Sequence, residues 1–126
     1  MEDTVFVVDN NDINLMLAER CLEDSCNVFT MRTAQKMFAM LDQITPHLIL
    51  IDVDMQDMDC FDVLSRLKSN KKSENIPVVI MTGSRDTHVD KKGIEMGATD
   101  LLIKPFSPSL FHSRVKLYIR ATKTLG

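Results

Sequence analysis

The chain is organised around the segment HLILIDVDMQDMDCF, which covers residues 47–61. In this segment an almost unbroken apolar run ends abruptly in four aspartates, at positions 52, 54, 57 and 59. An apolar run that follows Pro46 and stops at an acidic loop favours a strand covered on both faces, as in parallel α/β sheets, over an alternating strand or a helix. Asp52 would stand at the carboxyl end of that strand, where chemistry gathers in open α/β sheets. Asp52 is therefore the first candidate functional residue, and a merely solvated strand end is the alternative.

Length and composition indicate one ordinary globular domain. The chain of 126 residues is long enough to bury a core without disulfides, and it is 44% apolar and 26% charged. Its formal net charge of −3 provides no basic surface, so we expect no nucleic-acid binding. No apolar run approaches the ~20 residues of a membrane span, and the acidic start is unlike a signal peptide. We expect a cytoplasmic protein without membrane association.

The cysteines are odd in number and lack the close pairing that metal sites use. Cys21, Cys26 and Cys60 contain no CxxC spacing. This pattern is typical of buried or free thiols in a reducing compartment, and it does not indicate zinc.

Apolar periodicity predicts strands that alternate with helices along the whole chain. Strands are expected at residues 4–8, 27–31, 78–83 and 101–103, and in the apolar run before Asp52. Helices are expected at about 12–24, from the cap Thr33 to Ile44, from the cap Asp59 to Leu67, at 84–96, and after the cap Ser107. Such alternation predicts an α/β fold with a five-stranded parallel sheet, five helices on its two faces and right-handed crossovers.

Three of these helices carry further expectations. The first should bury an apolar face made of Ile13, Met16, Leu17, Cys21 and Leu22. The helix at 84–96 is the weakest, because it is polar in its first half and contains Gly93, and Gly97 should end it. The last helix should bury Leu110, Phe111, Val115 and either Leu117 or Tyr118.

The predicted strands end in residues whose chemistry belongs together. Asp9, Asp52, Thr82 and Lys104 each end one strand, so the parallel sheet would bring them to one edge. Adjacent carboxylates repel each other unless a cation lies between them, and hard oxygen ligands suit Mg²⁺. A carboxylate nucleophile, a divalent metal, a hydroxyl and a lysine are the parts needed for phosphoryl transfer to an aspartate.

Four motifs, in order and over nearly the whole chain, resemble the receiver domain of two-component response regulators. They are VVDNNDIN at 7–14, PHLILIDVDMQDMDCFDVL at 46–64, IPVVIMTG at 76–83 and GATDLLIKPF at 97–106. The resemblance implies a flavodoxin-like, doubly wound sheet of strand order 2-1-3-4-5.

The resemblance also assigns roles to individual residues. It implies that Asp52 is the phospho-acceptor and that Asp9, Asn10 and the backbone carbonyl of Asp54 join Asp52 around Mg²⁺. It implies that Thr82 and Lys104 contact the phosphoryl group, with Lys104 preceding a cis Pro105.

As a function, the resemblance implies a single receiver domain over residues 1–126, with 121–126 as a tail or the start of a linker. Asp52 would take its phosphoryl group from a sensor histidine kinase or a phosphotransfer protein, with Mg²⁺ as cofactor. Beyond this self-phosphorylation and slow autodephosphorylation the domain would not be an enzyme. A downstream effector or output domain would read the face formed by the fourth helix, the fifth strand and the fifth helix, through which two copies would also pair.

The sequence departs from the receiver pattern at four positions. Asn10 stands where the family usually has a second acid that ligates Mg²⁺, so one negative charge is absent. Gln56 replaces the usual proline and Cys60 the usual glycine, which implies a loop less fixed by its own sequence. Leu101 occupies the position of a switch aromatic, and we expect it to stay packed in both states, with the segment 83–93 carrying the switch.

Two other functions remain open from the sequence. The DVD triplet at 52–54 is also similar to that of haloacid dehalogenase phosphohydrolases, although there the motif comes near the start and an acidic motif follows the lysine. A receiver-like docking module that is never phosphorylated is the other alternative, and Asn10 is the feature that favours it.

Overall fold

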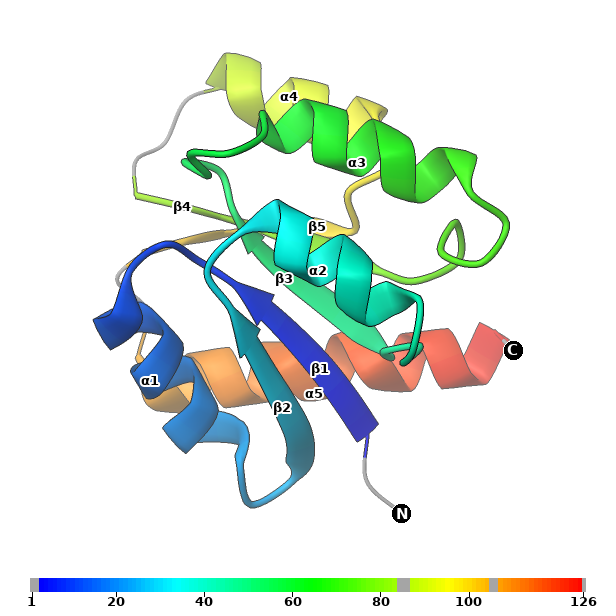
Figure 1. The fold of residues 1–126 in the computed structure, drawn as a ribbon. Coiled ribbons are helices and arrows are strands. Elements are labelled where there is room, and N and C mark those ends of the chain that lie inside the picture. Colours follow the sequence, from blue (N-terminus) through cyan, green and yellow to red (C-terminus); the bar gives the residue numbers. More distant parts are fainter. Residues whose placement is uncertain (1–2, 84–86, 105–106, 126) are drawn as a thin grey trace.

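The computed structural model describes residues 3–83, 87–104 and 107–125. In chain order its elements are β1 (Asp3–Val8), α1 (Asp12–Leu22), β2 (Cys26–Met31), α2 (Ala34–Leu41), β3 (Leu48–Asp52), α3 (Cys60–Ser69), β4 (Val78–Thr82), α4 (Thr87–Glu95), β5 (Asp100–Ile103) and α5 (Pro108–Leu125). The predicted α/β alternation is confirmed (Figure 1). Among the described residues, no helix is both long and apolar enough to cross a membrane.

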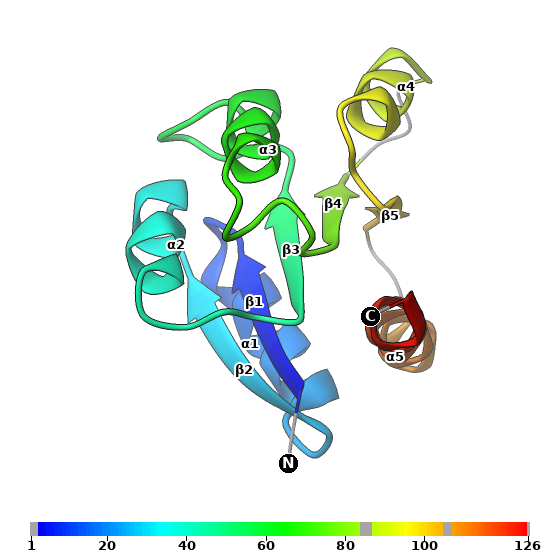
Figure 2. The ribbon, with the colours of Figure 1, turned by 90° about the vertical axis from the view of Figure 1, so that its right-hand side faces the viewer.

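The five strands form one parallel sheet in the order β2-β1-β3-β4-β5. This order confirms the predicted flavodoxin-like fold. The helices α2, α3 and α4 cover one face of the sheet and α1 and α5 the other (Figure 2). The central strands β3 and β4 are buried at every position, which accounts for their continuous apolar sequence.

Alternating residues of the strands divide the core into two layers. Toward α2 and α3 the sheet presents Phe6, Val8, Ile49, Ile51, Val78 and Ile80. Toward α1 and α5 it presents Val5, Val7, Leu48, Leu50, Val79 and Met81. Because the strand ends lie between the two layers, side chains at that edge are held by packing on both sides.

The expected helix caps are confirmed where the structure describes them. Thr33 accepts a 3.1 Å hydrogen bond from the backbone N–H of Lys36 and so caps α2. Asp59 caps α3 through Phe61, and Ser107 accepts from Leu110 at the start of α5. These side chains satisfy N–H groups that have no partner inside the helix, which fixes where each helix begins.

The predicted buried face of α1 is wrong in part. Ile13 and Leu17 are more than half exposed, at 62% and 53%, and Met16 is also exposed. The face that packs under the sheet is Leu15, Ala18 and Leu22, which also follows helical spacing. The helix ends two residues earlier than expected, at Leu22.

In α5, Phe111, Val115 and Tyr118 are buried as expected, whereas Leu110 and Leu117 are exposed. Leu110 follows Pro108 in the first turn, and the packing of α5 on the sheet selects the 111–115–118 stripe instead. The expectation for Leu110 is therefore wrong, and Tyr118 fills the core position for which Leu117 was the alternative.

Gly93 lies within α4 and Gly97 follows it, and each glycine has a structural role. Gly97 has a φ of +106°, which residues with a side chain rarely adopt. It follows the helix as expected. Gly93 is buried, and a Cβ atom there would lie 3.1 Å from Cδ1 of Ile80, so this glycine lets α4 approach β4 closely. The expected start of the helix at residue 84 lies outside the described residues.

Candidate functional site

The structure brings the predicted site residues to one edge of the sheet. Asp9 follows the last residue of β1, Asp52 ends β3, Thr82 ends β4 and Lys104 follows β5. Asp9, Asp52 and Thr82 are only 1%, 3% and 5% exposed. A carboxylate that is almost removed from water requires charged or polar partners, so this edge is a built polar site rather than a solvated rim.

Lys104 is the partner of both buried carboxylates. Its Nζ lies 3.0 Å from Oδ1 of Asp52 and 3.4 Å from Oδ2 of Asp9, and its side chain is 20% exposed. Pro105, which was expected to form a cis peptide bond with Lys104, lies outside the described residues. One ammonium therefore serves two acids, which leaves the three side chains with a net negative charge.

The electrostatics of the pair follow from this arrangement. Burial raises the pKa of Asp52, the hydrogen bond from Lys104 opposes that effect, and the negative charge of Asp9 adds to it. Burial alone would lower the pKa of Lys104, but its hydrogen bond to Asp52 and the two carboxylate charges raise it above the ordinary value. Lys104 is therefore positively charged, and a further cation nearby would stabilise the ionised form of Asp52.

The turn after β1 orients Asp9. Oδ1 of Asp9 accepts a 3.0 Å hydrogen bond from the backbone N–H of Asn11, and Oδ2 accepts a 3.2 Å bond from the side chain of Asn14. Asn11 caps α1 by accepting from the backbone N–H of Asn14. Sequence reasoning missed Asn14, although it lies in the quoted motif. Asn10 is half-buried next to Asp9, and its carbonyl accepts a long hydrogen bond of 3.4 Å from Arg32.

The acids of the loop after β3 point to different places. Asp54 is exposed, and its charge acts on Asp52. Asp59 caps α3. Both carboxylate oxygens of Asp57 accept backbone hydrogen bonds at the start of α2, from Ala34 at 3.1 Å and Gln35 at 3.0 Å. Sequence reasoning did not assign Asp57, because its partners lie more than 20 residues away.

The oxygen donors at this edge fit a hard cation such as Mg²⁺. The described residues contain no group of three His, Cys, Asp or Glu side chains that could hold a metal. A cation would thus rest on the carboxylates of Asp9 and Asp52, with the neutral oxygens of Asn10 and Asp54 and with water. Mg²⁺ commonly keeps several waters and uses only one or two carboxylates, so this donor set suits it. Because position 10 is an asparagine, the set has one carboxylate fewer than is usual in receiver domains.

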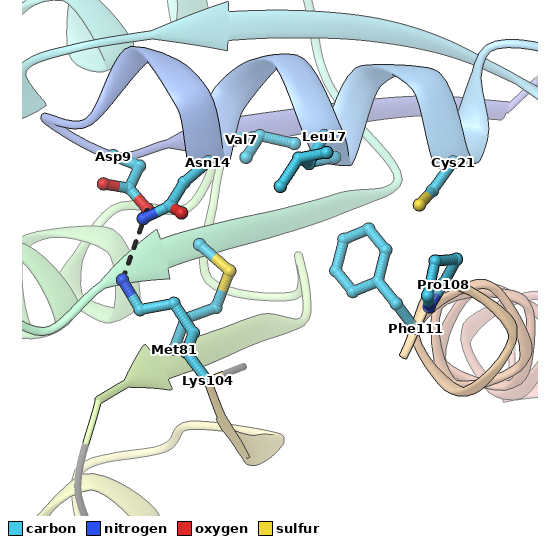
Figure 3. A pocket seen from close by; sticks show the side chains of 10 residues that line it. Val7, Asp9, Asn14, Leu17, Cys21, Met81, Lys104, Pro108 and Phe111 are labelled. Carbon is cyan, nitrogen blue, oxygen red and sulfur yellow. Dashed lines mark hydrogen bonds and ion pairs between the residues drawn. The ribbon is translucent and has the colours of Figure 1, made fainter. Parts of the chain in front are cut away.

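A pocket of about 240 Å³ lies beside the site, between α1 and α5. Asp9, Asn14 and Lys104 form one end of it, and Cys21, Pro108 and Phe111 form the other (Figure 3). Its wall is otherwise apolar, with Val7, Leu17 and Met81 between the two ends. An apolar neighbour strengthens the attraction between Lys104 and Asp9, because it lowers the local dielectric constant.

Two further departures from the receiver pattern, Cys60 and Leu101, are buried or half-buried. Cys60 is buried at the start of α3, and burial together with the charges of Asp59, Asp52 and Asp54 raises its pKa to about 12. This thiol is neutral and is not a nucleophile. Leu101 is half-buried and packs against the core layer that holds Ile80, so the leucine is directed inward.

The sheet is doubly wound and parallel, and buried aspartates, a hydroxyl and a lysine lie at the carboxyl ends of its strands. These features define the class: an α/β protein whose reactive side chains lie at that edge of the sheet. Within this class the chain belongs to the receiver domains of two-component response regulators, because the model of the response regulator receiver domain family matches residues 5–116. The resemblance found in the sequence is confirmed, and the haloacid dehalogenase alternative is wrong.

Curated relatives carry the same domain as part of longer proteins. The chain is 34% identical over 122 residues to the response regulator PleD of Caulobacter vibrioides, with 95% of this chain and 27% of PleD covered. It is 30% identical over 125 residues to the alkaline phosphatase synthesis transcriptional regulatory protein PhoP of Bacillus subtilis, with 98% and 51% covered. A probable cyclic di-GMP phosphodiesterase of Vibrio cholerae is 30% identical over 124 residues, with 95% and 28% covered. The chain thus spans about a quarter to a half of these relatives.

Solved structures show the same fold. The BeF3-activated DrrB receiver domain is 26% identical and has a TM-score of 0.85, with 95% of this chain and 99% of that chain covered. A CheY-like receiver domain protein from Methanospirillum hungatei covers 100% of both chains with a TM-score of 0.92. Its sequence identity is 19%, so this second likeness concerns the fold alone.

Proposed function

We propose that Asp52 accepts a phosphoryl group from a phosphohistidine on a sensor kinase or phosphotransfer protein, or from a small phosphodonor such as acetyl phosphate. The observation that carries this proposal is the contact of Lys104 with Asp52 at 3.0 Å and with Asp9 at 3.4 Å. A buried carboxylate can act as a nucleophile, and the ammonium of Lys104 is already in place to stabilise the negative charge of the aspartyl phosphate that forms. Phosphoryl transfer to an aspartate is also the function of the family to which the chain belongs.

In the transfer step, a carboxylate oxygen of Asp52 forms a bond to phosphorus while the bond from phosphorus to the donor nitrogen or oxygen breaks. The electron pair of that bond leaves with the imidazole or the acetate. Lys104 turns from Asp52 toward the phosphoryl oxygens, and the hydroxyl of Thr82 donates to them from the end of β4. Positioning and charge compensation supply most of the catalysis in such transfers.

Mg²⁺ bound at the same edge would neutralise the charge that grows on the phosphoryl oxygens. Asp9, Asp52, Asn10 and the carbonyl of Asp54 are the residues that would hold it. Asn11 and Asn14 keep Asp9 oriented, since their N–H groups occupy one position on each of its oxygens. The remaining lone pairs of Asp9 stay available for the cation.

Two sets of exposed apolar side chains suit the partners of such a domain. Ile13 and Met16 lie on α1, which begins three residues after Asp9, and they would contact the protein that delivers the phosphoryl group. Ile94, Ile103 and Leu117 are exposed on α4, β5 and α5, respectively, and they would contact an output domain, an effector or a second copy of the chain.

Intact-mass measurement tests the proposal directly. After incubation with acetyl phosphate and Mg²⁺, the wild type should gain the mass of one phosphoryl group and Asp52→Asn should gain none. Asp62→Asn is the matched control, because Asp62 is an exposed acid in the first turn of α3, and it should be labelled like the wild type. An unchanged mass of the wild type would instead favour the phosphorylation-independent docking module, which the loss of an acid at Asn10 supports.

A further inference from the structure

The loop between β3 and α3 is fastened to a helix that it does not precede. Asp57 in this loop accepts from the backbone N–H groups of Ala34 and Gln35, the first two residues of α2, through one carboxylate oxygen each. Thr33 satisfies the N–H of Lys36, so two side chains from different parts of the chain cap the same helix end. The helices α2 and α3 lie side by side on one face of the sheet, which brings the loop to this end (Figure 2).

The contact of Asp57 is the middle one of several that hold the loop. At the start of the loop, the N–H of Val53 donates to the carbonyl of Met81 in β4 at 2.8 Å. Met55 is buried in the core at 9% exposure, and at the far end Asp59 caps α3. Asp54, whose carbonyl is the proposed metal ligand, lies between Val53 and Met55.

The loop at residues 53–59 contains no proline that would restrict its backbone. The side chain of Gln56 does not restrict the backbone angle φ, whereas a proline at this position would hold φ at about −65°. The two hydrogen bonds of Asp57 provide a constraint from outside, because its carboxylate meets two N–H groups whose positions are set by the helix. Both oxygens of Asp57 accept hydrogen bonds from α2, so Asp57 would act on the metal site through the path of the loop.

We propose that Asp57 is a positioning residue for the metal site: by anchoring the loop to α2, it holds the carbonyl of Asp54 in the place that the cation requires. This inference rests on the proposed function. It assigns to Asp57 an effect on Mg²⁺ affinity that a simple helix cap would not have. Loss of a group that orients a metal ligand commonly lowers affinity by about 10–100-fold.

The test compares Mg²⁺ affinity, measured by calorimetric titration, among variants that separate the two roles. Asp57→Ala should bind Mg²⁺ at least about 10-fold more weakly than the wild type. Asp57→Asn keeps one acceptor oxygen and should fall between them. The matched control is Thr33→Ala, which removes the other cap of α2 without touching the loop, and it should bind Mg²⁺ like the wild type.

Thermal unfolding without Mg²⁺ and amide exchange accompany the titration. Both alanine variants should melt at a lower temperature than the wild type, and Asp57→Ala should lose protection at the amides of Ala34 and Gln35. Equal Mg²⁺ affinity in Asp57→Ala and the wild type, while the wild type is phosphorylated, would overturn the positioning role alone. Absence of both Mg²⁺ binding and phosphoryl uptake in the wild type would reject the proposed function together with this inference.

Discussion

The backbone N–H of Lys104 donates a 2.7 Å hydrogen bond to the carbonyl of Thr82. This bond continues the ladder in which Thr82 pairs with Ile103, and it fixes the residue that carries the ammonium against the residue that carries the hydroxyl. The two proposed phosphoryl contacts are thus joined by the sheet itself. A change in the side chain of Thr82 leaves this backbone bond in place.

Thr82→Ala should therefore keep the fold and lose a donor. Removing one hydrogen-bond donor to developing charge typically costs about 10²–10³ in rate, and Lys104 remains, so we expect phosphorylation by acetyl phosphate to slow by about 10- to 100-fold. Thr82→Ser retains the hydroxyl and should stay within a few-fold of the wild type. The measurement is the time course of phosphorylated mass, and equal rates for alanine and wild type would show that Thr82 does not contact the phosphoryl group.

The raised pKa of Asp52 predicts how stability depends on pH. Because the folded state raises this pKa through burial and the charge of Asp9, folding favours the protonated acid, and stability is lost as pH rises through the folded pKa. At neutral pH without Mg²⁺, Asp52→Asn should therefore be more stable than the wild type. The difference should vanish as pH falls below the ordinary value of 3.8.

Urea unfolding between pH 3.5 and 8 measures this difference. A less stable Asp52→Asn at neutral pH would mean that the ion pair with Lys104 outweighs the burial of the carboxylate. Added Mg²⁺ should stabilise the wild type more than the variant, because the cation binds the charged form.

Asn10→Asp should restore a second acid to the turn after β1. A carboxylate in place of a neutral amide adds one negative charge next to Asp9, so we expect Mg²⁺ to bind at least about 10-fold more tightly. Without Mg²⁺ the same change should lower stability, since the new charge adds to those of Asp9 and Asp52. Titration that gives equal or weaker affinity would place residue 10 away from the metal.

The sequence predicts those features of this domain that depend on neighbouring residues. The alternation of strands and helices, the edge that carries Asp52 and the caps Thr33 and Asp59 follow from local patterns and from the rules of parallel sheets. The strand order came instead from the resemblance to receiver domains, and the structure confirms it. The buried face of α1 does not follow from local patterns, because both Ile13–Leu17 and Leu15–Ala18–Leu22 repeat at helical spacing and only packing selects between them. The role of Asp57 also depends on the fold, because its hydrogen-bond partners in α2 are more than 20 residues away in the sequence.

Gly93 illustrates this limit and can be tested. Local propensity treats it as a defect that costs roughly 1 kcal/mol in a helix, whereas the structure shows a close contact, with the added Cβ 3.1 Å from Cδ1 of Ile80. Gly93→Ala alone should be neutral or destabilising. In an Ile80→Val background, which removes Cδ1, the same change should stabilise by up to about 1 kcal/mol. Urea unfolding of all four proteins gives the coupling, and equal effects in both backgrounds would refute the contact.

The last prediction concerns how phosphorylation reaches the surface. Leu101 is already half-buried and packs in the core layer with Ile80, its partner across the β4–β5 ladder. A leucine has no polar atom that would favour an outward position in either state. We therefore expect Leu101 to keep its rotamer, and its methyl carbon-13 shifts should stay unchanged when beryllofluoride occupies the site.

Switching must then be carried by the backbone that follows Thr82. Helix α4 is the candidate, because it is polar and contains Gly93, and segments of low local stability are the ones that move. A phosphoryl oxygen that draws Thr82 inward can shift α4 between two arrangements only by its differential contact energy, on the order of 1–3 kcal/mol. Hydrogen exchange should change by about 5- to 150-fold across α4 on beryllofluoride binding, while α1 serves as the internal reference. Unaltered exchange in α4 at full occupancy of Asp52, or a changed rotamer of Leu101, would show that another element carries the output.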